Sequence, residues 1–224
     1  MSPAAAPVTT DGSRRLVVLR HGETTFNAAG IWQGQLDSPL SPRGEEQAAA
    51  VGPALAALGP VRVVTSDLQR ARRTGESVAR AAGVPLVEEP RLREIHAGEW
   101  QGLTNEEVRR DWPEVYDRLR AGEDVRRPGG GESLGDVRDR AARAVEEVLE
   151  TTGPGECVVL STHGAAGRTV VSWLLGLDVV QGWRILGALG NCHWAELVEG
   201  RGGWRLLTWN ASAAGPAGAG ETPS

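Results

Sequence analysis

Lysine is absent from this chain of 224 residues, and all 24 of its basic side chains are arginines. Without lysine the protein has neither the lysine of a phosphate-binding P-loop nor a lysine that could form a Schiff base with a carbonyl substrate. Arginine remains, and its planar fork of N–H donors suits phosphate oxygens. We therefore expect any phosphate site in this chain to be built around arginine.

Cysteine is scarce, since only Cys157 and Cys192 occur, so the sequence indicates neither a disulfide framework nor a thiolate metal site. We expect both to be buried, reduced thiols. No run of 18 apolar residues and no signal or transit segment is present, which predicts a cytoplasmic protein that does not span a membrane. The net charge of -5 disfavours a nucleic-acid partner, because such surfaces are usually basic.

The length suits one α/β domain with a sizeable core. We predict that the folded domain spans residues 14–210. Residues 1–13 and 211–224 are rich in Ala, Gly, Pro, Ser and Thr, and we expect them to be disordered ends.

Helix and strand patterns alternate along this domain, which is typical of a sheet covered by helices on both faces. We expect a three-layer α/β/α sandwich whose central sheet is mostly parallel, with a late antiparallel edge. The predicted strands are residues 16–19, 61–65, 84–87 and 157–160, followed by a hairpin of 192–198 and 204–209. The predicted helices are residues 43–58, 68–82, 104–112, a second one ending near 119, one capped by Ser133 that ends at 149, and 164–175.

Three of the predicted strands lead into charged residues. The first runs directly into Arg20 and His21, the second is followed by Arg70, and the fourth by His163. The carboxyl ends of parallel strands meet at the edge of a sheet where ligands bind, so these four side chains should converge there. Because arginine binds phosphate and neutral imidazole is a nucleophile, the set indicates phosphoryl transfer through a phosphohistidine.

His21 is the predicted nucleophile. One ring nitrogen must be unprotonated for attack on phosphorus, which is easiest if the other donates its proton to a main-chain carbonyl. His163 would donate to the phosphate, and Gly164 after it would let the backbone approach the anion at a helix N-terminus. No metal-ligand spacing accompanies these residues, and two clamping arginines would repel a dication, so we expect no metal and no other cofactor.

The same residues carry a resemblance to a known family. Residues 20–24 (Arg-His-Gly-Glu-Thr) with Asn27, and then residues 33–41 (Gln-Gly-Gln-Leu-Asp-Ser-Pro-Leu-Ser), resemble the signature of the histidine phosphatase, or phosphoglycerate-mutase-like, superfamily. The likeness runs from about residue 15 to 210. It implies a phosphoric monoester hydrolase or a mutase that works through a phosphohistidine on a small phosphomonoester.

The residues alone leave two assignments open, the second phosphate-binding arginine and the proton donor, and the resemblance implies one residue for each. From the residues alone, Arg70, Arg72 and Arg73 all could be the second phosphate clamp, and the resemblance implies Arg70. Glu23, Glu94 and Glu99 likewise compete as the proton donor to the leaving oxygen, and the resemblance implies Glu94. It further implies that Asn27 and Gln33, besides Arg20, Arg70, His163 and Gly164, bind the substrate.

Phosphatases and mutases of this family differ in the length of the segment that covers the site. Glu94 and His163 are 69 positions apart, and in this short segment the chain resembles the phosphatases. A mutase needs a longer covering segment, because it must exclude water from its phosphoenzyme. The alternatives are a broad-specificity acid phosphatase, a cofactor-dependent phosphoglycerate mutase, or a phosphate-binding module that is not an enzyme. A homodimer is left open.

A narrower resemblance concerns the substrate. Residues 98–104, 130–133 and 209–212 (Trp-Asn-Ala-Ser) are similar to glucosyl-3-phosphoglycerate phosphatases of glucosylglycerate biosynthesis. This implies glucosyl-3-phosphoglycerate, or mannosyl-3-phosphoglycerate, as the substrate. Around the added sugar we expect His96 and Trp100 to supply polar and stacking contacts.

Overall fold

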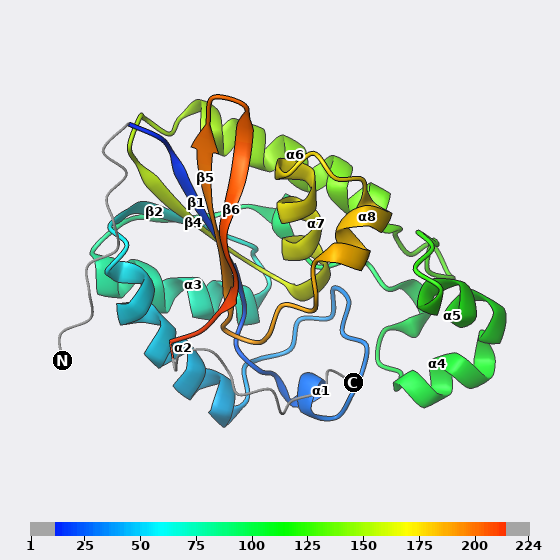
Figure 1. Cartoon of the computed structure of the whole chain (residues 1–224). Helices are drawn as coiled ribbons and strands as arrows, with labels where there is room; N and C mark the ends of the chain where they lie inside the picture. The colour runs from blue at the N-terminus through cyan, green and yellow to red at the C-terminus, as the bar shows by residue number, and fades with distance from the viewer. Residues whose placement is uncertain (1–11, 214–224) are drawn as a thin grey trace.

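A computed structural model describes residues 12–213 of the chain (Figure 1). Most of the two predicted tails, 1–13 and 211–224, lies outside these residues. Ala211, the first residue of the expected C-terminal tail, is the last residue of a strand. Within residues 12–213 no helix is long and apolar enough to cross a membrane.

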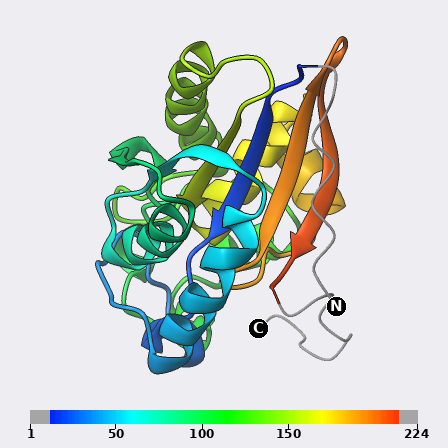
Figure 2. The same ribbon diagram turned by 90° about the vertical axis from the view of Figure 1, so that its left-hand side faces the viewer.

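The core of the fold is a six-stranded sheet with the order β3-β2-β4-β1-β5-β6. Its first four strands are mutually parallel, whereas β5 runs antiparallel to β1 and to β6. Figure 2 shows β1, β5 and β6 side by side at this antiparallel edge. The strands are β1 (Arg15–Arg20), β2 (Pro60–Thr65), β3 (Leu86–Glu88), β4 (Cys157–Thr162), β5 (Trp194–Gly200) and β6 (Gly203–Ala211).

Helices cover both faces of the sheet, because successive residues of a strand point to opposite sides. In β1, Val17 and Leu19 pack into the core with α2 (Pro42–Ala56) and α3 (Gln69–Ala82). Leu16 and Val18 pack into the opposite core, against helices on the other face. Those helices are α6 (Leu134–Glu150) and α7 (Gly164–Leu174), and α8 (Val179–Ile185) packs against α7. The predicted three-layer sandwich with an antiparallel edge is confirmed.

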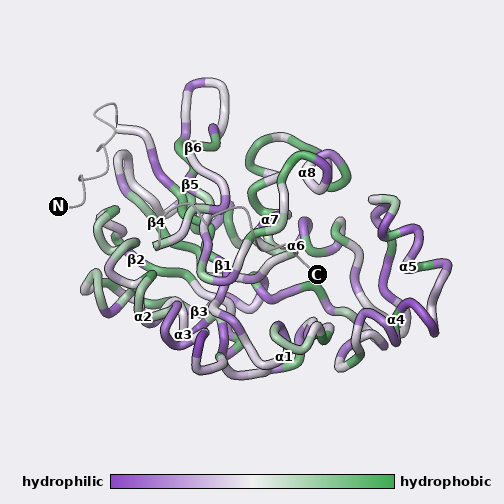
Figure 3. Tube along the Cα trace, turned by 60° about the horizontal axis from the view of Figure 1, so that its bottom comes forward, coloured by the Kyte–Doolittle hydropathy of each residue, from purple (hydrophilic) through white to green (hydrophobic). Residues whose placement is uncertain are grey.

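A small cap stands beside the sandwich, between β3 and α6 in the chain. It consists of α4 (Asn105–Asp111) and α5 (Pro113–Arg120), with two 3-10 turns before them, η1 (Pro90–Leu92) and η2 (Gly98–Trp100). Figure 1 shows α4 and α5 projecting to one side, and Figure 3 shows that they are largely hydrophilic. Their apolar residues form a separate core around Trp100.

Local signals account for most helix boundaries. Ser41 caps α2 and Pro42 is its first residue, Gly83 ends α3 with a left-handed φ of 68°, and Thr104 begins α4 in a capping box. The sequence patterns missed the short helix α1 (Thr25–Ala28), both 3-10 turns and α8. The late hairpin was predicted from residue 192, but Cys192 lies in a turn with a left-handed φ of 54°, and β5 begins at Trp194. Both cysteines are free and buried, as expected.

Candidate active site

A cavity of about 940 Å³ opens where β1 ends. Six of the predicted site residues line it, namely Arg20, His21, Asn27, Gln33, Arg70 and Glu94. His163 and Gly164 do not line the cavity, and His163 is fully buried behind it. Among residues 12–213, no three His, Cys, Asp or Glu side chains are grouped so that they could hold a metal ion.

The imidazole of His21 is held in one orientation. Its Nδ1–H donates to the main-chain oxygen of Gly22 at 2.7 Å, as predicted, so Nε2 carries the lone pair. Burial, followed by the charges of Arg70 and Arg20, holds the pKa of His21 well below 6.5. The ring is therefore neutral at physiological pH, and Nε2 is available as a nucleophile.

His163 lies beside His21, with the two ring centroids 5.1 Å apart. Its Nε2 is 2.9 Å from Oγ of Ser66, and that Oγ also accepts from the N–H of Leu68 at 3.3 Å. The Ser66 hydroxyl can donate its proton to Nε2, and in that tautomer of a neutral His163 the ring proton lies on Nδ1. This Nδ1 is buried and has no hydrogen-bond partner. It is a donor without an acceptor, next to His21.

The two predicted clamp arginines are anchored through their terminal guanidinium nitrogens, Nη1 in Arg20 and both Nη1 and Nη2 in Arg70. Arg20 donates through Nη1 to the main-chain oxygen of Leu189 at 2.6 Å. Arg70, which is 1% exposed, donates to the main-chain oxygens of Leu36 and Gly34 at 2.7 and 2.8 Å. In both side chains the buried Nε has no partner. Burial lowers the pKa of Arg20, and burial lowers that of Arg70 to about 10, so Arg70 is still charged at neutral pH.

Glu94 lies at the N-terminus of α7. Its Oε1 accepts from the N–H groups of Ile95 at 2.9 Å and Ala166 at 3.0 Å, and its Oε2 accepts from Ala165 at 3.1 Å. We expected the N–H groups at this helix start to bind the phosphate, but two of them bind this carboxyl group instead. A Cβ at Gly164 would lie 3.5 Å from the guanidinium of Arg20 and 3.7 Å from Oε2 of Glu94.

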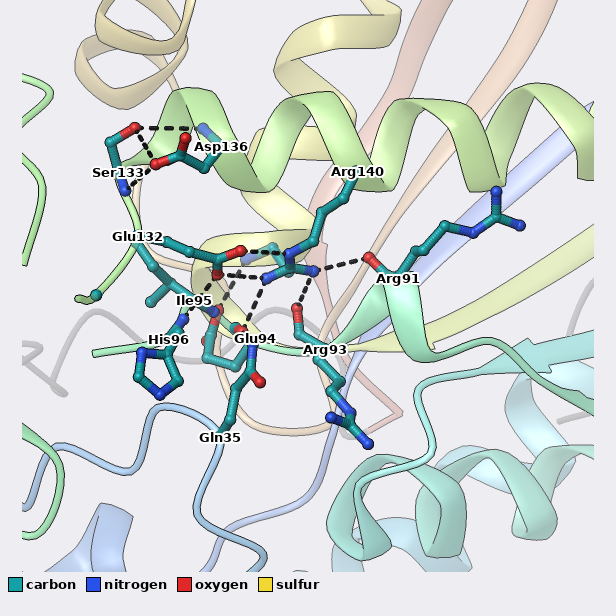
Figure 4. A network of polar contacts seen from close by, with 12 residues as sticks. Gln35, Arg91, Arg93, Glu94, Ile95, His96, Glu132, Ser133, Asp136 and Arg140 are labelled. Carbon is teal, nitrogen blue, oxygen red and sulfur yellow. Dashed lines mark hydrogen bonds and ion pairs between the residues drawn. The ribbon is translucent and has the colours of Figure 1, made fainter. Parts of the chain in front are cut away.

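A partly buried ion pair between Arg140 and Glu132 fixes the backbone that carries Glu94 (Figure 4). Arg140 on α6 donates to the main-chain oxygens of Arg93 and Glu94 at 2.7 and 2.9 Å. The same guanidinium binds the carboxylate of Glu132 at 2.8 and 2.9 Å, and this carboxylate accepts from the main-chain N–H of His96 at 2.8 Å. The irregular loop is thereby tied to α6, the longest helix within residues 12–213, which keeps Glu94 in place.

Asn27 and Gln33 belong to the polar rim of the cavity. The amide oxygen of Asn27 accepts from the N–H of Thr24 at 3.1 Å, and that of Gln33 accepts from Oγ of Ser38 at 2.6 Å. With their oxygens occupied, both amides have N–H groups left for a ligand. Asn191 donates to the main-chain oxygen of His21 at 3.1 Å and so joins the rim to the nucleophile.

Residues 16–212 match the profile of the histidine phosphatase superfamily (branch 1). The chain belongs to this superfamily.

Individual relatives are similar over nearly the whole chain. A glucosyl-3-phosphoglycerate phosphatase of Mycolicibacterium vanbaalenii is 42% identical over 89% of this chain and 96% of its own length. A probable phosphoglycerate mutase, GpmB, of Serratia proteamaculans is 32% identical over 94% of this chain and 96% of its own. The solved structure of a mycobacterial glucosyl-3-phosphoglycerate phosphatase complexed with VO3 is 38% identical, with a TM-score of 0.80 over 89% of this chain and 100% of that one.

One expectation for this histidine phosphatase is wrong. Trp100 does not face a ligand, because it is fully buried in the core of the cap, and neither Trp100 nor His96 lines the cavity. Trp100 packs edge to face against Trp32, with ring centroids 5.0 Å apart, and Trp32 is the ring that lines the cavity. Hydrophobicity alone does not tell which of two contacting tryptophans lines the cavity and which is buried behind it.

The sequence interpretation also missed several cavity residues. Trp183 of α8 lines the cavity with its ring 3.7 Å below the guanidinium of Arg168, and His193, expected at an exposed edge, lines it as well. Asn210, with a φ of 59°, accepts from the N–H of Gly190 and so joins the hairpin to the rim. Arg127 lines the cavity from the loop after α5. An arginine pair in a polar loop carries no local signal of burial, so only its environment in the fold distinguishes Arg127.

Proposed function

We propose that this chain is a metal-independent phosphomonoesterase that acts through a phosphohistidine at His21. One observation carries the proposal: Nε of Arg20, Nε of Arg70 and Nδ1 of His163 are buried N–H groups without acceptors, and they belong to the side chains around His21. Buried donors are normally satisfied, and the three equatorial oxygens of a phosphoryl group supply the missing acceptors.

In the first step, Nε2 of His21 bonds to phosphorus while the bond from phosphorus to the ester oxygen breaks. Arg20, Arg70 and His163 bind the equatorial oxygens, whose charge they stabilise in the transition state. Glu94 transfers its proton to the departing oxygen, which leaves as an alcohol. The products of this step are phospho-His21, ionised Glu94 and the free alcohol.

In the second step, water attacks the phosphorus of phospho-His21. Ionised Glu94 removes a proton from the water as the N–P bond breaks, which regenerates neutral His21 and protonated Glu94 and releases inorganic phosphate. One carboxyl group therefore serves as the acid in the first step and the base in the second. Hydrolysis is favoured over mutase activity because the segment between Glu94 and His163 is short and adds only α4 and α5 as a cap.

For the substrate, we propose glucosyl-3-phosphoglycerate or its mannosyl counterpart. The relative with 42% identity supports this, and so does the size of the cavity, which at about 940 Å³ is large for a three-carbon phosphate ester. Trp32, Phe26 and Trp183 line the cavity and offer aromatic faces to a sugar ring. Aromatic contact that the smaller 3-phosphoglycerate cannot make should appear in kcat/KM.

The experiment is rapid acid-free quench of the enzyme during turnover of phosphate-labelled glucosyl-3-phosphoglycerate. We expect an acid-labile, base-stable phosphate on the peptide that contains His21, and we expect activity to survive EDTA. The variant His21→Ala should form none of this species, whereas the control His96→Gln, outside the cavity, should behave as the wild type.

Strong loss of activity in EDTA, or label on any other residue, would contradict the mechanism. Dominant conversion of 3-phosphoglycerate into 2-phosphoglycerate would contradict hydrolysis and indicate a mutase. The cytoplasmic location and the homodimer stay predictions, and light scattering in solution tests the latter.

A further inference from the structure

Two buried arginines of this protein lack an ion-pair partner. In the described part of the chain, the arginines classed as buried are Arg15, Arg70 and Arg127, with 7%, 1% and 3% of each residue exposed. Arg15 is paired with Glu196 at 3.4 Å, but neither Arg70 nor Arg127 has a carboxylate within 4.0 Å among residues 12–213. A buried charge without a counter-ion is costly, so each of the two requires an anion from elsewhere. The substrate phosphate serves Arg70.

The carboxylates around Arg127 are engaged with other groups. Glu132 is bound by Arg140, as Figure 4 shows, and Glu94 accepts the N–H groups at the start of α7. Asp124 accepts two main-chain N–H groups at the start of α6. Burial lowers the pKa of Arg127, although Asp124, Glu94 and Glu132 act in the opposite direction. No carboxylate of the described chain therefore neutralises Arg127 by direct contact.

The loop holds Arg127 rigidly at the cavity wall. Its Nη1 donates to the main-chain oxygen of Val125 at 2.8 Å, its own N–H donates to that of Glu132 at 3.2 Å, and its carbonyl accepts from Gly131 at 3.1 Å. Its buried Nε has no partner. Arg127 lines the cavity together with Glu94, on the side of the cap, where Leu119 of α5 lines it too. Arg127 is thus a fixed cation in the same cavity as Glu94, whose charge acts on it.

We propose that Arg127 binds a second anion of the substrate, the carboxylate of its phosphoglycerate part. This inference rests on the proposed function. Arg20 and Arg70 neutralise the phosphate, and the carboxylate belongs to the same three-carbon unit as the phosphate ester, so a third arginine in the same cavity is placed to select phosphorylated acids over phosphorylated neutral sugars.

The experiment compares two substrates and four proteins. The substrates are glucosyl-3-phosphoglycerate and the analogue in which a hydroxymethyl group replaces the carboxylate. The proteins are the wild type, Arg127→Gln, Arg127→Lys and the matched control Arg126→Gln, whose arginine is adjacent in sequence but 61% exposed and paired with Asp136. We expect Arg127→Gln to lower kcat/KM for the carboxylate substrate by about 10- to 100-fold, mainly through KM, as for loss of one hydrogen-bonded charge.

The analogue and nitrophenyl phosphate should be hydrolysed by Arg127→Gln within about threefold of the wild-type rate, because neither has a carboxylate for Arg127 to bind. Arg127→Lys should recover part of the loss, and Arg126→Gln should show none. Equal losses on both glucosyl substrates would overturn the proposal and assign Arg127 to the phosphate or to the loop. An unchanged KM in Arg127→Gln, or the same loss in Arg126→Gln, would overturn it as well.

Calorimetric titration with 3-phosphoglycerate and with inorganic phosphate separates this proposal from the proposed function, because it needs no turnover. The wild type should bind 3-phosphoglycerate more tightly than phosphate, and Arg127→Gln should lose that preference. A wild-type protein that prefers 3-phosphoglycerate through Arg127 but releases no phosphate from any ester would refute the proposed phosphatase and leave the carboxylate site standing.

Discussion

The substitution Glu94→Gln tests the proposed proton donor with little change of shape. The side chain keeps its size, and its amide oxygen can take the position of Oε1, where it still accepts from Ile95 and Ala166. The amide nitrogen then faces the N–H of Ala165, 3.1 Å from the position of Oε2, so two donors oppose each other. The variant loses one hydrogen bond and its ability to donate a carboxylic proton.

Both losses have an expected size. Leaving one buried N–H unsatisfied costs about 1 to 3 kcal/mol of folding free energy. The melting temperature should fall by about 2 to 4 °C per kcal/mol in a domain of this length. Loss of a general acid slows the step that it catalyses by about 10²- to 10⁴-fold, but only where the leaving oxygen needs a proton.

Nitrophenyl phosphate separates the acid role of Glu94 from its base role. Nitrophenolate leaves without a proton, so the first-turnover burst of Glu94→Gln should stay within about threefold of the wild type, while steady turnover slows because hydrolysis of phospho-His21 still needs the base. With glucosyl-3-phosphoglycerate the burst itself should be lost. A stopped-flow measurement in which both bursts slow equally would refute the assignment of Glu94 as the acid. Glu99→Gln, an exposed carboxylate of the same loop, is the control.

Two further predictions concern stability. Burial and the charge of Arg70 lower the pKa of His21 and His163 below 6.5, so the unfolded state binds more protons than the folded state. The stability present above pH 6.5 is therefore lost as pH falls toward the folded-state pKa values, by about 1.4 kcal/mol per pH unit for each histidine. Urea unfolding of His163→Gln should show a shallower pH dependence than the wild type, and an unchanged slope would contradict this. Replacing glycine by alanine stabilises an ordinary helix by about 1 kcal/mol, but Gly44→Ala should destabilise the folded protein and lower kcat/KM. The reason is that its Cβ would overlap the carbonyl of Glu23, close to His21 in the chain. Gly202→Ala, with open space around it, is the control for both the stability and the activity measurement.

Local chemistry explains which parts of the site were predictable. The strand that ends at Arg20 and His21, the capping box at Thr104 and the left-handed Gly83 depend on residues a few positions apart, and the sequence contains them in full. The predicted hydrogen bond from the ring of His21 to a main-chain carbonyl also closes within one residue. These features hold in the structure because they need no distant partner.

Long-range packing decided the rest. Trp100 and Trp32 are chemically alike, and only the fold of the cap places one inside and the other at the cavity. Arg126 and Arg127 are neighbours in one loop, yet the first is exposed and ion-paired and the second is buried without a carboxylate.

Hydrophobic period, helix capping and residue type are local properties, so the fold class, the strand-end histidine and the arginine chemistry could be predicted from the amino-acid sequence. Tertiary packing alone places Glu94 at the N-terminus of α7, Trp32 rather than Trp100 at the cavity, and Arg127 rather than Arg126 in a buried position. Burial and counter-ions are contributed by segments such as α5, α6 and α7 that are distant in sequence, and no pattern along the chain records which of them meet.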